Sequence, residues 1–220
     1  MNKKEKLYRE IKKFTKWADQ CHPTWSEERD NGEWELGYPH FEELCGAAED
    51  VVNEYPCSEA DETLIHALLF VIARDNECEE LVEEKLVLHS DWFELLARKS
   101  IGSKYVNAEW QFAKHLGDCE GCDPELLFLF IKSEYEYTSR MALQTMAELK
   151  PECAEHYAFE FWDRGKYPEG SSEDEYQKIM ALHVLAKLNS PKLEAYLERA
   201  MQSDYKWLRK NAEELSAKYN

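Results

Sequence analysis

Residues 133–142 read SEYEYTSRMA, and the order of residue types in this stretch recurs along the chain. A serine, a charged residue and a tyrosine follow one another from Ser103, Ser133 and Ser203. Ser172 with Tyr176 is a looser copy. Nine residues after the last three of these serines stand Ala142, Ala181 and Ala212. A hydroxyl cap, an aromatic residue in the first turn and a small residue in mid-helix favour a helix that packs closely on its partner.

The rest of the chain also shows helical periodicity. Apolar residues recur at Leu7, Ile11, Phe14 and Ala18, and Ser58 is expected to cap a deeply buried helix that contains residues 64–72. Glycine and proline number only eight and seven, too few for the many hairpins of a sheet protein of this length. We therefore predict an all-α fold of about twelve helices in six antiparallel pairs, forming a single domain over residues 1–220.

The repeated pattern resembles HEAT and armadillo repeats, in which antiparallel helix pairs of about 40 residues stack into an α-solenoid. The resemblance is best over about residues 90–218 and covers the first 90 residues only by their helix count. Arg140, Arg209 and Lys210 fall where second helices of HEAT repeats often carry a basic residue. Because the typical turn proline and aspartate are mostly absent, a generic helical bundle is the alternative. The resemblance implies a protein that holds another macromolecule.

Charge is concentrated in one part of the sequence. The net charge is −18, and the stretch from Ser26 to Glu84 holds 19 acidic residues against only Arg29 and Arg74. Phosphate contacts need clustered lysine and arginine, so nucleic acid is not an expected partner. Concentrated carboxylates would instead accelerate the encounter with a basic protein.

Residues 21–38 are predicted to form an irregular acidic loop, because Pro23, Gly32 and Gly37 interrupt the helical pattern. Its tryptophans and tyrosine look exposed, and these residue types dominate interface energetics. The alternative is that its aromatic side chains fold back onto the core. The predicted partner-binding residues are Trp25, Glu27, Glu28, Asp30, Glu33, Trp34, Glu35 and Tyr38.

Catalytic and metal-binding motifs are scarce. Cys119 and Cys122 form a C-x-x-C pair, the spacing that lets two thiolates bind zinc or form a redox disulfide. No second such pair accompanies them, so we favour two unpaired thiols and predict no metal site. Neither a nucleophile elbow nor a glycine-rich phosphate loop occurs. We expect no cofactor and no enzymatic activity.

The N-terminal sequence MNKKEK leads into charged residues without an apolar signal segment, and no apolar run approaches the roughly 20 residues that span a bilayer. Together with an odd number of cysteines, this predicts a soluble cytoplasmic protein.

Three functional hypotheses follow. The leading one is a module that binds a basic protein through the acidic N-terminal half, for example an immunity or inhibitor protein that neutralises a basic nuclease toxin. The second is an enzyme similar to the HEAT-like DNA glycosylases, and the third is a scaffold or adaptor. The second requires basic residues to converge with aromatics on one face, and those available are Arg140, Lys187, Lys192, Arg199, Lys206, Arg209 and Lys210.

Overall fold

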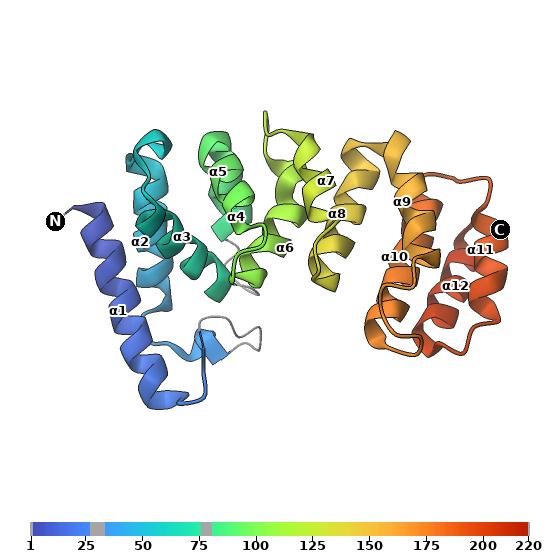
Figure 1. The fold of residues 1–220 in the computed structure, drawn as a ribbon, viewed down its shortest axis with the longest axis horizontal. Helices are drawn as coiled ribbons and strands as arrows, with labels where there is room; N and C mark the ends of the chain where they lie inside the picture. Colours follow the sequence, from blue (N-terminus) through green and yellow to red (C-terminus); the bar gives the residue numbers. More distant parts are fainter. Residues whose placement is uncertain (1, 27–33, 76–80, 220) are drawn as a thin grey trace. The chain divides into compact units, whose positions relative to one another are not determined.

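The computed structural model describes residues 2–26, 34–75 and 81–219, and within these ranges the chain forms helices and turns but no strand (Figure 1). The predicted all-α fold, with helices packed in neighbouring pairs, is confirmed. Contacts divide the chain into two compact units: an N-terminal unit, residues 1–130, and a C-terminal unit, residues 131–220. In the described part, no helix has the length and apolarity that crossing a bilayer requires.

The N-terminal unit is built around one almost fully buried helix. Its helices are α1 (Lys3–Cys21), α2 (Phe41–Glu54), α3 (Glu62–Arg74), α4 (Leu81–Glu84), α5 (Ser90–Ser100), α6 (Val106–His115) and α7 (Leu127–Phe130). Helix α3 packs against α1, α2, α5 and α6, and nearly all of its side chains from Leu64 onward are buried. The prediction of a deeply buried helix here is confirmed, because an apolar surface on all sides of a helix requires neighbours on all sides.

The C-terminal unit has two layers of helices. Its helices are α8 (Glu136–Leu149), α9 (Pro151–Asp163), α10 (Ser172–Lys187), α11 (Leu193–Met201) and α12 (Lys206–Tyr219). In one layer α8 packs on α10 and α10 on α12, while α9 and α11 pack against this layer. Ala142, Ala181 and Ala212 are fully buried, as the repeated position of a small residue predicts.

Two predicted helix caps are wrong. Asp61, not Ser58, caps α3, and Ser171, not Ser172, caps α10 by accepting a hydrogen bond from the backbone N–H of Asp174 at 3.2 Å. The other repeated serines behave differently again: the Ser203 hydroxyl accepts from the N–H of Tyr205, two residues on, at 3.2 Å. Such a serine stabilises the turn that precedes the helix, so the helix begins three residues later.

Candidate functional site

An aromatic cluster surrounds Phe14 near the C-terminal end of α1. The Phe14 ring is fully buried, and the ring centroids of Trp17, Trp25, Trp34 and Tyr38 all lie within 6.1 Å of its own. Trp17 and Trp34 are stacked, with centroids 5.8 Å apart and planes inclined by 20°. The Trp25 indole N–H donates to the Asp19 carboxylate at 2.8 Å. These contacts fold the described ends of the predicted loop back onto α1.

The structure divides the predicted partner-binding residues into three groups. Glu27, Glu28, Asp30 and Glu33 lie outside the described residues. Trp25 and Trp34 are half-buried, so part of each ring faces solvent. Glu35 and Tyr38 are 2% and 5% exposed, which corrects the expectation that they lie on the surface.

Burial of Glu35 has a physical reason in α3. Its carboxylate lies 3.6 Å from the guanidinium of Arg74, itself 3% exposed, at the C-terminal end of that helix. A buried cation is costly unless a carboxylate accompanies it, so Glu35 serves the fold. Sequence periodicity cannot reveal this pairing because the two residues lie on separate elements.

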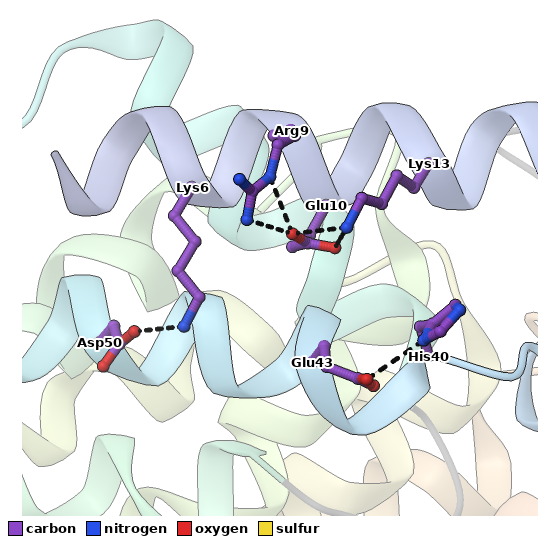
Figure 2. A network of polar contacts seen from close by, with 7 residues as sticks. All are labelled: Lys6, Arg9, Glu10, Lys13, His40, Glu43 and Asp50. Atoms are coloured by element: carbon purple, nitrogen blue, oxygen red, sulfur yellow. Dashed lines mark hydrogen bonds and ion pairs between the residues drawn. The ribbon is translucent and has the colours of Figure 1, made fainter. Parts of the chain in front are cut away.

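Polar contacts on α1 and α2 form a network that was not anticipated, and the contact between Lys6 and Asp50 joins the two helices (Figure 2). The buried Glu10 carboxylate accepts hydrogen bonds from Lys13 at 2.8 Å and from Arg9 at 2.9 Å. Burial alone would raise the pKa of Glu10, but the hydrogen bonds from Lys13 and Arg9 outweigh it and hold the pKa below its ordinary value. The sequence does indicate that Glu10 is buried, because it stands three residues after Leu7 and four before Phe14, on the apolar stripe of the helix.

The same network joins the lysine-rich face of α1 to acids of α2. Lys6 donates to Asp50 at 2.6 Å, and Lys3 lies 3.0 Å from both Asp50 and Glu54. Hydrogen bonds from Lys6 and Lys3 lower the pKa of Asp50. Part of the negative charge of α2 is therefore neutralised within the unit, while Glu42 at its first turn is exposed.

Tyr38 places a polar atom inside the aromatic cluster. Its hydroxyl is buried, and no described residue hydrogen-bonds to it. Burial raises the pKa of Tyr38, and the negative charges of Glu10 and Glu43 raise it further. The phenol therefore stays neutral at physiological pH.

The outer side of the cluster forms what we call the tryptophan surface, made of Trp17, His22, Trp25 and Trp34. All four side chains are half-buried, and the His22 ring centroid lies 4.5 Å from that of Trp34. Asp19, bound to Trp25, is exposed beside them. Indole faces attract cations, and a neighbouring carboxylate adds an ion pair, so the chemistry of this surface suits a lysine or arginine side chain.

The basic residues on which the enzyme hypothesis depends converge only in part. Five of them belong to the layer of α8, α10 and α12: Arg140, Lys187, Lys206, Arg209 and Lys210. The other two are associated with α11, where Lys192 lies over the Phe159 ring and Arg199 over those of Trp162 and Tyr196.

The cysteine pair is corrected as well. Cys119 and Cys122 are joined in a disulfide, rather than present as two unpaired thiols. In the part of the chain that the structure describes, no group of three or more histidine, cysteine or carboxylate side chains is placed to hold a metal ion.

The chain matches no family model, and no curated protein or solved structure shows significant similarity to it. The resemblance to HEAT repeats therefore rests on the helix pairs and on the repeated positions described above.

Proposed function

We propose that this protein is a binding module without catalytic activity, which recognises a basic protein segment through the tryptophan surface of its N-terminal unit. One observation carries the proposal: half-buried tryptophans lie beside an exposed carboxylate in the more acidic unit of the chain. The N-terminal unit contains 29 acidic and 14 basic residues, against 16 and 13 in the C-terminal unit. This excess of negative charge attracts a basic partner before contact.

Recognition would combine two interactions. A lysine or arginine of the partner would lie over the Trp25 or Trp34 ring, within about 6 Å of its centroid. A second basic residue would pair with the exposed carboxylate of Asp19. Tryptophan is prominent among interface residues that contribute most to affinity, because it buries a large area with few rotatable bonds.

The finer version of the proposal is an inhibitor or immunity protein that neutralises a basic nuclease in the cytoplasm, built as a HEAT-like solenoid. A scaffold that holds a basic subunit would use the same surface. Both versions are supported by the same charge asymmetry, and neither requires a catalytic group.

A fluorescein-labelled lysine- and arginine-rich peptide tests the proposal by fluorescence anisotropy. We expect salt-sensitive binding, weakened about tenfold by Trp25→Ala. Asp19→Asn should also weaken it, since the amide oxygen keeps the hydrogen bond to Trp25 but loses the charge.

The matched control is Trp207→Ala, which removes a half-exposed tryptophan from the C-terminal unit. Thermal melts would establish that each variant is folded. Equal losses of affinity in Trp25→Ala and Trp207→Ala would contradict the proposed surface. So would an affinity that changes neither with salt concentration nor with Trp25→Ala.

A further inference from the structure

A second aromatic surface lies on the C-terminal unit and follows the sequence repeat. Four residues after Ser133, Ser172 and Ser203 stand Tyr137, Tyr176 and Trp207. Their side chains are 40%, 42% and 48% exposed, so large aromatic rings face solvent at one equivalent position of each of α8, α10 and α12. We call these three residues the aromatic row.

Basic side chains lie over the rings of the aromatic row. The guanidinium carbon of Arg140 is 4.7 Å from the Tyr137 centroid and 5.0 Å from that of Tyr176, so it joins two neighbouring helices. Lys206 and Lys210 approach the Trp207 ring at 4.8 and 5.5 Å. The row is thus both aromatic and cationic.

Hydrogen bonds to two carboxylates connect the helices that carry the row. Glu136 of α8 accepts a hydrogen bond from Gln177 of α10 at 2.8 Å. Glu175 of α10, at the equivalent repeat position, accepts from the backbone N–H groups of Trp207 and Leu208 at 2.6 and 2.9 Å. Each helix start is therefore tied to its neighbour, and α12 has its N-terminus capped from another helix.

A groove continues the same face. Its cavity volume is about 590 Å³, and its lining combines the apolar residues Met180, Val184, Ala186 and Leu215 with the polar residues Gln144, Glu148, His183, Lys187 and Lys218. Gln144 and His183 stand seven residues after Tyr137 and Tyr176, while Lys187 and Lys218 stand eleven after Tyr176 and Trp207. Seven and eleven residues are about two and three helical turns, so row and groove share one face.

This face is less acidic than the rest of the chain, whose net charge is −18. Along α8, α10 and α12 its basic residues are Arg140, Lys187, Lys206, Lys210 and Lys218, and its acids are Glu136, Glu148, Glu173 and Glu214. We propose that the face binds an acidic peptide segment in extended form, with carboxylates meeting Lys187 and Lys218 at the groove and apolar side chains meeting the aromatic row. This inference goes beyond the proposed function because both the surface and the charge of the ligand differ.

Two features favour a peptide over single-stranded nucleic acid. The acids of the face lie beside its cations, with Glu148 bound to Lys187 and Glu214 at 3.7 Å from Lys210. A peptide can place a few carboxylates away from these acids, whereas single-stranded nucleic acid carries a negative charge at every nucleotide. The rings also recur once per packed helix, about 8–10 Å apart. That interval matches side chains three residues apart in a polyproline II peptide, which has three residues per turn and a rise of about 3.1 Å per residue, better than adjacent stacked bases.

Fluorescence anisotropy of the full chain would test the proposal with a fluorescein-labelled peptide that repeats phenylalanine, glutamate and serine, so that phenylalanine recurs at every third residue. We expect binding that Lys187→Ala with Lys218→Ala weakens about tenfold, and that Trp207→Ala also weakens. The charge-matched control is Lys192→Ala with Arg199→Ala, two exposed cations of the α11 side, which should leave affinity within about twofold of the wild type.

Several results would overturn this assignment. These are no binding of the acidic peptide, equal losses in both double variants, or tighter binding of a labelled oligothymidylate that depends on the same lysines. Self-association seen by light scattering and abolished by Lys187→Ala with Lys218→Ala would assign the face to a second copy instead. Loss of this binding leaves the basic-peptide experiment unaffected, because that experiment uses a probe of opposite charge and its test variants, Trp25→Ala and Asp19→Asn, lie in the other unit.

Discussion

The two units both expose aromatic rings, but they do so by different physical means. In the N-terminal unit, rings from a helix and from the segments after it collect around buried Phe14, in the more acidic unit. In the C-terminal unit, one ring per helix recurs at an equivalent position, and basic side chains of the same unit cover it. The tryptophan surface therefore depends on the packing of its rings around Phe14. The aromatic row depends instead on the repeated position of one aromatic residue in each of α8, α10 and α12.

The largest expected effect concerns the core of the N-terminal unit. Leu68 of α3 is fully buried, so Leu68→Ala should lower the free energy of unfolding by about 2–5 kcal/mol. Leu88→Ala is the control, because that side chain is 74% exposed and should change stability by less than about 0.5 kcal/mol. Urea unfolding measures both. Similar stabilities of the two variants would show that α3 is not the centre of this unit.

A smaller effect is expected where the aromatic row depends on a cap. Glu175→Ala removes the acceptor for two backbone N–H groups of α12 and should cost about 0.5–2 kcal/mol, as loss of a helix cap does. It should also increase amide hydrogen exchange at the start of α12. The control is Glu173→Ala, an exposed acid in the same first turn of α10. If both variants exchange alike, Glu175 does not position Trp207.

The smallest expected effect is a difference in the response of the two units to acid. The pKa values of Glu10 and Asp50 lie below their ordinary values of 4.5 and 3.8, so these carboxylates stabilise the folded form above those values. That contribution is lost as the pH falls through their lower folded-state pKa values. Burial raises the pKa of Glu136 above 4.5, with Arg140 opposing it, so protonation of Glu136 favours the folded form. Its contribution to stability therefore rises as the pH falls towards 4.5.

Isosteric variants separate these contributions. Glu10→Gln should destabilise the protein at neutral pH, and the difference from the wild type should shrink below pH 4.5. Glu136→Gln resembles the protonated form at every pH, whereas the wild type gains stability as Glu136 becomes protonated. The free energy of unfolding of the variant, relative to that of the wild type, should therefore fall as the pH approaches 4.5 from neutral. Urea midpoints across this range provide the measurement, and changes of the same sign in the two variants would contradict opposite roles for the two acids.

Local patterns in the sequence determined the helices and the repeated alanines. Periodicity places Leu7, Phe14 and Ala18 on one buried face, and the spacing from the repeated serines finds Ala142, Ala181 and Ala212. Such features depend on residues within a few turns of one another, which is the range over which a helix is specified. The aromatic row was present in the same register, and it could have been found by following each repeat four residues beyond its serine.

Only the tertiary structure decided which polar and aromatic groups stay at the surface. Tyr38 is buried because its ring packs against Phe14, and Glu35 is buried because Arg74 lies beside it. Glu175 caps α12 from another helix. These contacts join residues on separate elements, in two cases more than 30 positions apart, so no local pattern encodes them. Local sequence thus determined where helices form, while long-range packing determined which charges and rings remain available to a partner, because burial depends on what each face meets.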